Sequence, residues 1–423
     1  MVGGFVRDVV RLFSHQTIND NQPLVHDIDI ATNMPMDDLK KAFRWSSNNG
    51  EGHGTILVHF GSTFEVTQFR VDGHYSDGRH PDTVAFTEDF AEDTARRDFT
   101  INSMGMDADG NIIDFHGGYE DIKSKVIRAV GDPERRFNED ALRMVRAIRF
   151  SAVFGYEIEA STMEAIRKCA YGISMVAMER IHAEICKVID SGDANALFRF
   201  CRLLSLSGLP RHFDPNGYGD WHNVYGLVSR YACEHGSPEE YGAFAQIDYE
   251  TFICMLFANS AITHNIRKMC EFYRCSAKAT KTLMWFHEMR KRIGMVRFDS
   301  RDFNNLHRYP TETNGRLVTD LYRIATSPER ELFVRLYPYV ANVECHEAGN
   351  TTLNDVLGII DRLIDRVPQR AKIVESIRKC SKSSNLGQLA DAVQERVLRD
   401  AIGRFYLTDS SLSELVLEVE HNK

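Results

Sequence analysis

The hydrophobic pattern of the chain changes once, near residue 138, and this change constrains the fold more than any other feature. Before it, short strand-like runs stand at 28–31, 55–60, 64–69 and 111–115. These runs predict strands, with one amphipathic helix among them at Pro35–Phe43. After it, apolar residues recur every three or four positions at 139–154, 161–170, 176–190 and 194–207. The sequence therefore predicts a mixed α/β head followed by an all-helical remainder.

Glycine and proline mark the expected ends of these elements. Gly61–Ser62–Thr63 is expected to close a hairpin between the runs 55–60 and 64–69. Pro210–Gly219 holds two prolines and two glycines, which predicts a loop and a domain edge. Helix stops are expected at Gly155, Gly172 and Gly192.

Length and composition indicate a multidomain protein. The 423 residues exceed a single ordinary core, so two to four domains are expected. Nine cysteines occur without a C-x-x-C pair, which is typical of a reducing compartment and argues against a zinc site. No apolar run is long enough to span a bilayer, and no signal segment opens the chain. We therefore expect a cytoplasmic protein without a membrane partner.

Charge is unevenly distributed along the chain. The formal net charge is −9, yet residues 1–140 alone hold 25 acidic and 14 basic residues. The stretch 267–301 is basic, with ten Lys and Arg against three acidic residues. An acidic head that holds cations, followed by a basic stretch, is typical of an enzyme that acts on a polyanion. A solvated helix face is the alternative interpretation of the basic stretch.

Asp27 and Asp29 are the first candidate site residues. Alternating strand geometry directs side chains i and i+2 to the same face, so both carboxylates can share a divalent metal. Gly3–Gly4 precedes them and lets backbone N–H groups approach a phosphate. Glu65 is a possible third carboxylate. Carboxylates for a metal and a backbone site for phosphate suit phosphoryl or nucleotidyl transfer. The alternative interpretation of Asp27 and Asp29 is a solvated strand end.

A second cluster reads Arg96–Arg97–Asp98, with Asn102 four residues further on. Adjacent arginines suit the spread charge of a triphosphate. Asp98 can accept a hydrogen bond from a ribose hydroxyl, and Asn102 can serve sugar or phosphate. A surface ion-pair patch is the alternative.

The segment 136–150 is expected to open the first helix of the remainder, with Asn138 as its N-cap. Asp140, Arg143 and Arg146 follow one another at i, i+3 spacing and form one polar stripe, with Arg149 near its edge. Opposite them, a second stripe faces the core: Leu142, Val145 and Ile148. A carboxylate beside an arginine fork can read a nucleobase edge; an exposed helix with internal ion pairs would look the same.

Seven motifs in order resemble the class II tRNA nucleotidyltransferases, the CCA-adding enzymes, whose head bacterial poly(A) polymerases share. Besides the motifs above, the resemblance rests on Asp77–Pro81, Gly118–Ile122, Arg136–Arg143 and Glu179–Ile181. It is strong over residues 1–190 and weak beyond. The connection Val9–Leu24 is longer than is usual in the family. Fewer residues precede the Gly-Gly pair than in most family members.

The resemblance implies an α+β fold with a DNA polymerase β-like nucleotidyltransferase head, followed by an elongated all-helical neck, body and tail. The implied divisions are a head at 1–137, a neck at 138–208, a body at 209–330 and a tail at 331–423. Residues 70–82 would form a flexible loop associated with the change from C to A addition. The basic stretch 267–301 is expected to bind the RNA.

The family also implies roles for the head residues. Asp27 and Asp29 would bind catalytic Mg²⁺. The phosphates of the incoming nucleotide would be contacted by Gly4, Arg7 and Arg97. Asp98 would test for ribose.

Further roles follow for the helix after residue 138. Asp140 and Arg143 would pair with the base of CTP or ATP, so that protein side chains act as the template. Arg146 and Arg149 would support that helix and the triphosphate.

The implied activity is addition of C and A to the 3′ end of tRNA, with the enzyme holding the acceptor and T arm. CC-adding or A-adding activity and poly(A) polymerase activity are alternatives within the family. The acidic end at Asp409–Lys423 argues against the poly(A) polymerase. A catalytically silent RNA-binding protein is the alternative of another class.

Overall fold

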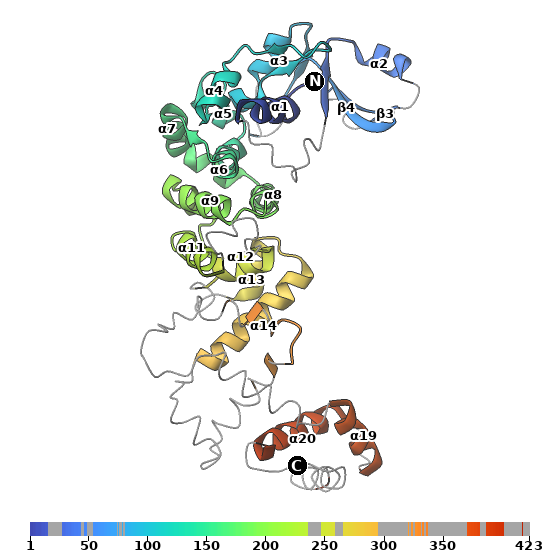
Figure 1. Ribbon diagram of the computed structural model, residues 1–423, viewed down its shortest axis with the longest axis vertical. Coiled ribbons are helices and arrows are strands. Elements are labelled where there is room, and N and C mark those ends of the chain that lie inside the picture. The colour runs from blue at the N-terminus through green and yellow to red at the C-terminus, as the bar shows by residue number, and fades with distance from the viewer. Residues whose placement is uncertain are drawn as a thin grey trace. The chain divides into compact units, whose positions relative to one another are not determined.

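The computed structural model (Figure 1) describes residues 1–15, 28–43, 46–48, 54–73, 75, 78, 81–235, 247–258, 265–294, 320, 323–324, 326–330, 332–333, 336, 370–380, 386–401 and 417. The chain forms two compact units. The first is Met1–Tyr249 with Phe272–Arg274, and the second is Glu250–Glu271 with Cys275–Lys423. The fourfold domain division expected from sequence stays a prediction.

A four-stranded sheet forms the head, in the order β1-β4-β3-β2. Strand β1 runs parallel to β4, and β2, β3 and β4 are antiparallel neighbours. The helix α2 packs on this sheet through Leu39, which joins Ile56, Val58 and Val66 in one buried cluster. The bounds are β1 Asp29–Thr32, α2 Met36–Ala42, β2 Ser46–Asn48, β3 Thr55–Phe60 and β4 Ser62–Gln68. The strands expected at 28–31, 55–60 and 64–69 are thus confirmed to within two residues.

The hairpin between β3 and β4 is tighter than expected. Phe60 pairs with Ser62, so one residue makes the turn and the expected three-residue loop Gly61–Ser62–Thr63 is wrong. Gly61 has φ of +67°, a conformation that only glycine adopts at no cost. Ser62 and Thr63 are therefore free to continue the strand.

The first helix, α1 (Gly4–His15), was not expected from the sequence pattern. Its buried residues Val6 and Val10 recur at four-residue spacing, which is a helical period. Val2 bridges to Asp29 of β1 and to Gly105, so the start of α1 lies beside the edge of the sheet. The sequence analysis found the connection Val9–Leu24 to be unusually long. Its residues 9–15 belong to α1, and residues 16–27 lie outside the described part.

Short elements complete the head. Antiparallel pairs join β5 to β6 and β7 to β8, and the latter shortens the strand expected at 111–115 to two residues. Their bounds are β5 Arg70–Asp72, β6 Val84–Phe86, α3 Phe90–Ala95, η2 Thr100–Asn102, β7 Gly105–Met106, β8 Ile112–Ile113, α4 Gly118–Ser124, β9 Val126–Ile127 and β10 Glu157–Ile158. In the expected flexible loop at 70–82, residues 74, 76, 77, 79 and 80 lie outside the described part.

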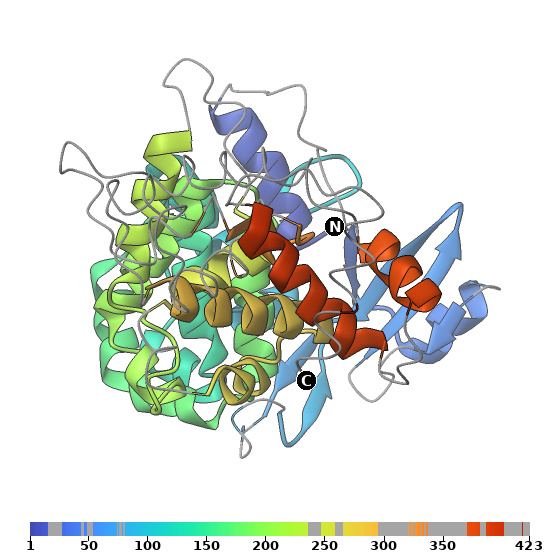
Figure 2. The ribbon, with the colours of Figure 1, turned by 90° about the horizontal axis from the view of Figure 1, so that it is seen from below.

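Helices follow, as expected, and α6 lies at their centre with α8 and α9 packed against it. The helix α11 packs in turn on α9, and Figure 2 shows these green helices gathered side by side. The bounds are α5 Pro133–Glu139, α6 Leu142–Phe154, α7 Ala160–Cys169, η3 Ala170–Met175, α8 Met178–Ile189, α9 Ala194–Ser207, α10 Pro210–Phe213 and α11 Val224–His235.

The segment expected to open one helix at Asn138 forms two helices instead. Asp132 caps α5, because its carboxylate accepts from Glu134 N at 3.0 Å and Pro133 fits the first helical position. Asn138 therefore lies in the last turn of α5 and is not an N-cap. Asp140, in extended conformation, separates α5 from α6. The expected core stripe is confirmed, since Leu142, Val145 and Ile148 are buried.

Two further expectations on turns are corrected. Gly172 lies within the 3₁₀ turn η3 and ends no helix. The segment Pro210–Gly219 begins with the short helix α10. Gly155, by contrast, caps α6 in the left-handed conformation, as expected.

The described part of the second unit is helical. Its helices are α12 Tyr249–Leu256, which begins at the boundary, α13 Ile266–Phe272, α14 Ala277–Gly294, α19 Arg370–Cys380 and α20 Leu386–Ala401. The pair α19 and α20 packs together. The basic stretch expected at 267–301 lies on α13 and α14 as far as residue 294. Among the described helices, none has the length and apolarity needed to cross a membrane.

Candidate functional site

A cavity of about 390 Å³ opens in the first unit, where α1, β1 and α6 meet. Its walls combine a glycine pair, three carboxylates and five arginines. The lining residues are Gly3, Gly4, Arg7, Asp29, Arg96, Arg97, Asp98, Asn102, Asp140, Arg143, Arg146 and Phe150. This density of cations in one small space suits a polyanionic ligand.

The structure brings together most of the residues singled out from sequence. Arg149 and Glu65 do not line the cavity, and Asp27 lies outside the described residues. Sequence reasoning did not single out Phe150, which also lines the cavity. It gave Gly3 and Arg96 roles only as members of the Gly-Gly and Arg-Arg pairs.

Gly3 forms the floor of the cavity between Asp29 and Arg97. Its φ is +68°, and a Cβ there would lie 3.2 Å from Arg97 Nη1 and 3.7 Å from Asp29 Oδ2. A side chain at this position would therefore crowd both groups. Glycine leaves the backbone open to a close ligand.

Asp29 begins β1, and its side chain lines the cavity. Its register partner on the parallel strand β4 is Glu65, and register partners share one face of a sheet. Carboxylate oxygens are the ligands that Mg²⁺ prefers, so Asp29 fits a divalent cation. No cluster of three acidic, His or Cys ligands occurs within the described residues, and Asp27, the expected second ligand, is not among them.

Arg7 reaches the cavity from α1 and is firmly held. Asp8 accepts from its Nε at 2.9 Å and from its Nη2 at 2.8 Å, while Asn102 Oδ1 accepts from Nη1 at 2.8 Å. Three of its five N–H donors are thus used within the described residues. The remaining two stay available to a ligand in the cavity.

Asp98 is the polar centre of the site. Arg146 donates to its Oδ2 at 2.7 and 2.9 Å, and Asn102 donates to its Oδ1 at 3.0 Å. Burial raises the pKa of Asp98, but Arg146 and the hydrogen bonds outweigh burial and bring the pKa to about 2. The carboxylate is therefore ionised, and it links the head to α6.

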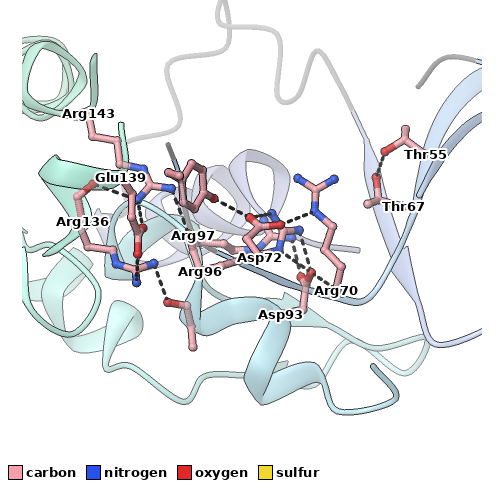
Figure 3. Close-up of polar contacts among 12 residues, drawn as sticks. Thr55, Thr67, Arg70, Asp72, Asp93, Arg96, Arg97, Arg136, Glu139 and Arg143 are labelled. Carbon is pink, nitrogen blue, oxygen red and sulfur yellow. Dashed lines mark hydrogen bonds and ion pairs between the residues drawn. The ribbon is translucent and has the colours of Figure 1, made fainter. Parts of the chain in front are cut away.

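The arginine pair belongs partly to an internal ion-pair network, shown in Figure 3. Asp93, which is 1% exposed, accepts from Arg96 at 2.7 Å and from Arg97 at 3.2 Å. Arg96 also lies 3.7 Å from Asp72 of β5. The network ties β5 to the cavity wall, so the ion-pair interpretation holds for Arg96, while Arg97 also reaches the floor beside Gly3.

A tyrosine completes the network on the side of β5. Tyr75 OH donates to Asp72 at 2.7 Å. Burial and this hydrogen bond raise the pKa of Tyr75 to about 12, so the hydroxyl keeps its proton. The connection that follows β5 is therefore attached to the network at Tyr75.

Asp140 and Arg143 both line the cavity, but each is held by a partner that sequence reasoning did not single out. Arg180 of α8 donates to Asp140 at 2.8 and 3.2 Å. Glu139 accepts from Arg143 at 2.7 Å, and Arg143 also donates to the Arg136 carbonyl at 3.1 Å (Figure 3). Arg180 lies in the motif Glu179–Ile181, which was the available signal.

Arg149 acts behind the cavity wall. It donates to Glu184 at 2.5 Å, and Glu184 also pairs with Arg146 at 3.7 Å and with Lys187 at 2.8 Å. Glu184 is 2% exposed, so three cations compensate one buried carboxylate. This arrangement supports α6 and leaves Arg149 away from a ligand.

Comparison with protein families agrees with this site. Residues 1–128 match the poly(A) polymerase head domain. Residues 155–213 match the family described as "Probable RNA and SrmB- binding site of polymerase A". The cavity lies in the first match and in the two helices that directly follow it.

Relatives identify the class more closely. A CCA-adding enzyme of Leuconostoc mesenteroides is 43% identical over 195 residues, which cover 46% of this chain and 46% of that one. A CCA-adding enzyme of Oceanobacillus iheyensis is 44% identical over 206 residues, covering 48% and 49%. The chain thus spans about half the length of the curated relatives it matches. Its N-terminal half is similar to that of CCA-adding enzymes.

Solved structures extend the likeness of fold to the whole chain. The CCA-adding enzyme of Bacillus stearothermophilus in complex with CTP gives a TM-score of 0.59 at 23% identity, covering 100% of this chain and 93% of that one. An apo CCA-adding enzyme gives 0.62 at 17%, covering 99% and 90%. A tRNA nucleotidyltransferase with a primer tRNA and an ATP analogue gives 0.52 at 19%, covering 81% and 94%. The expected fold, a mixed α/β head followed by helices, is therefore confirmed. Nucleotidyltransferases generally use a divalent metal.

Proposed function

We propose that this protein adds C and A to the 3′ end of tRNA, using CTP and ATP and releasing pyrophosphate. The single observation that carries the proposal is one cavity in which Asp29, the Asp98–Arg146 pair and the Asp140/Arg143 wall come together. It therefore offers a metal ligand, a ribose-sized polar centre and a base-reading edge. The matches to CCA-adding enzymes support the same activity.

The base is read at the wall formed by Asp140 and Arg143. Cytosine and adenine both present an amino donor beside a ring-nitrogen acceptor, whereas uracil and guanine present a carbonyl and an N–H there. A carboxylate accepts from the amino group and an arginine donates to the ring nitrogen. One pair of side chains thus selects both nucleotides and rejects the other two.

The phosphates lie between α1 and the Arg96–Arg97 turn. Arg7 has two N–H donors left, and Arg97 reaches the floor beside Gly3, so both oppose the spread charge of the triphosphate. Asp98 and Asn102 stand where the ribose would join base and phosphate. Their fixed hydrogen bonds orient the sugar at no further entropic cost.

Asp29 and Asp27 are the proposed Mg²⁺ ligands. A Mg²⁺ ion held there would make the 3′ hydroxyl more nucleophilic and would neutralise the charge of the pyrophosphate that leaves. The carboxylate of Asp29 would hold the cation near Gly3, which has no side chain to crowd it. A hard-oxygen site of this kind favours Mg²⁺ over softer metals.

The tRNA is proposed to lie along the helices of the second unit, with its acceptor and T arm on the basic stretch. Lys278, Lys281 and Lys291 of α14 are exposed, and Lys278 and Lys281, at i, i+3 spacing, lie on one face of the helix. Changing Lys278 and Lys281 together to Gln should weaken tRNA binding at low salt and reduce its salt dependence. CTP binding should stay unchanged.

The test of the activity supplies tRNA that lacks the terminal triplet with CTP, ATP or both. Addition of C, C and A in order supports the proposal. Addition of two C residues alone, or of A alone, identifies a CC-adding or an A-adding enzyme, and long A tails identify a poly(A) polymerase. No incorporation from any nucleotide, with tRNA binding intact, identifies a silent RNA-binding protein.

A further inference from the structure

Two aromatic rings of α6 stand one helical turn apart beside the cavity. Phe150 and Phe154 stack with centroids 5.6 Å apart and planes 22° from parallel. Phe150 lines the cavity, whereas Phe154 does not and is half-buried behind it. The proposed mechanism gives neither ring a role.

Arg7 lies over both of these rings. Its guanidinium carbon is 5.4 Å from the Phe150 centroid and 5.0 Å from the Phe154 centroid. Its in-plane hydrogen bonds go to Asp8 and Asn102. The hydrogen bonds at the edge of the guanidinium fix its position, and the two rings beside it fix its tilt.

A second arginine of α1 holds the far side of the platform. Arg11 lies 3.9 Å from the Phe154 centroid, and its nearest carboxylate, Asp8, is 3.4 Å away. Its Nε is buried without a hydrogen-bond partner among the described residues. Two guanidiniums of α1, those of Arg7 and Arg11, therefore lie over the Phe154 ring.

We propose that Phe154 is a positioning residue for the triphosphate, acting through Arg7. A guanidinium near an aromatic face is attracted by the ring quadrupole, most strongly where water is partly excluded. Phe154 belongs to the same helix as Arg143 and Arg146, while Arg7 belongs to α1. The ring thus keeps the phosphate-binding arginine of the head in register with the base-reading helix. This inference rests on the proposed function for the identity of the ligand.

The alternative is that Phe154 only fills space between α1 and α6. Replacing Phe154 by Leu or Met keeps an apolar side chain but removes the π-face, whereas Tyr keeps the face. A packing role predicts similar behaviour from Leu and Met and a cost from the extra hydroxyl of Tyr. A positioning role predicts that Tyr resembles the wild type and that Leu and Met do not.

The measurement is calorimetric binding of CTP and of inorganic tripolyphosphate to the full chain without tRNA. Phe154→Leu should weaken both probes by the same factor, roughly two- to thirty-fold, because only the phosphate contact changes. Phe154→Tyr should bind both as the wild type does. Phe198→Leu is the matched control, since Phe198 is a half-buried ring of α9 with an edge contact to Tyr225. In the incorporation assay, KM for CTP should rise more than kcat falls.

Each outcome decides between the positioning role and the packing role of Phe154. Phe154→Leu that binds tripolyphosphate as the wild type does overturns the positioning role, and so does Phe154→Tyr that loses as much as Leu. Phe154→Met repeats the measurement if the Leu variant fails to fold. If the wild type binds both probes in a Phe154-dependent way but extends no tRNA, the proposed function fails and the positioning role stands. A wild type that binds neither probe overturns both.

Discussion

Asp98 accepts both the Nε and the Nη2 hydrogen bonds of Arg146, at 2.9 and 2.7 Å. The carboxylate follows the arginine pair of the head, and the guanidinium belongs to α6. Because the two come from elements 48 residues apart, their fork fixes the orientation of the two walls of the cavity. Both bonds end on Oδ2, while Oδ1 accepts from Asn102, so each carboxylate oxygen has its own charge-assisted or neutral donors.

Breaking this pair should therefore affect both stability and sugar recognition. Asp98→Asn should lower the free energy of unfolding by about 1–3 kcal/mol, because it removes the charge that pairs with Arg146 and puts an amide N–H₂ among groups that donate to the carboxylate. The preference for ribonucleotides over deoxyribonucleotides should fall as well. Denaturant titration and incorporation from dCTP measure the two effects. Asp109→Asn, an exposed carboxylate of the head, should change neither.

The proposed metal ligands can be separated from structural residues because Asp29 is exposed. Asp29→Asn should reduce incorporation more than about 100-fold, since the cation contributes several kcal/mol to the transition state. Its melting temperature should match that of the wild type. The same is expected of Asp27→Asn. Asp38→Asn, on the exposed face of α2, is the control, and retained incorporation by Asp29→Asn would contradict the assignment.

The sequence predicted the sheet and the site well where local pattern is sufficient. Strand β3 has the expected bounds because its β-branched and apolar run from Thr55 to Phe60 is bounded by Gly54 and Gly61. Asp29, Asp98 and Asp140 each stand in a short motif that can be found in the sequence alone, and all three line the cavity. In these cases the local signal and the tertiary structure agree.

Other features depend on partners that are distant in sequence. Asn138 was expected to start a helix, yet the Asp132 cap starts one six residues earlier. Asp140 then leaves the helical conformation and pairs with Arg180, 40 residues away. Spacing shows that Asp140 and Arg143 can share a face, but it cannot show that each is held by a third residue. The helix α1 was missed because the Gly-Gly pair was interpreted as a turn alone.

Arg180 should consequently influence nucleotide choice without touching the nucleotide. Arg180→Gln removes two hydrogen bonds from Asp140, and a charge-assisted hydrogen bond contributes about 1.5–3 kcal/mol. Misincorporation from UTP relative to CTP should rise roughly tenfold or more. The neighbouring Arg274→Gln is the control, because it removes an exposed ion pair with Glu179. Equal fidelity in both variants would show that Asp140 needs no support from α8.

The second unit should respond to pH through His287. This side chain of α14 is 7% exposed, and neither ring nitrogen has a hydrogen-bond partner among the described residues. Burial, together with the nearby Arg290, lowers its pKa to about 3. The unfolded state then binds a proton more tightly than the folded state does. The contribution of neutral His287 to stability is complete above the unfolded pKa of about 6.5 and is lost as the pH falls toward 3.

Replacing His287 by Phe should remove this dependence. Between pH 6.5 and 3, each unit of acidification costs the wild type about 1.4 kcal/mol that the variant does not lose. The variant should thus gain about 2 kcal/mol relative to the wild type between pH 7 and pH 5. Chemical denaturation at both pH values measures the gain, and His222→Gln, an exposed histidine, should show none. If the free energies of unfolding of wild type and His287→Phe differ by the same amount at pH 7 and pH 5, the prediction is wrong. The buried imidazole would then be protonated or hydrogen-bonded in the folded protein.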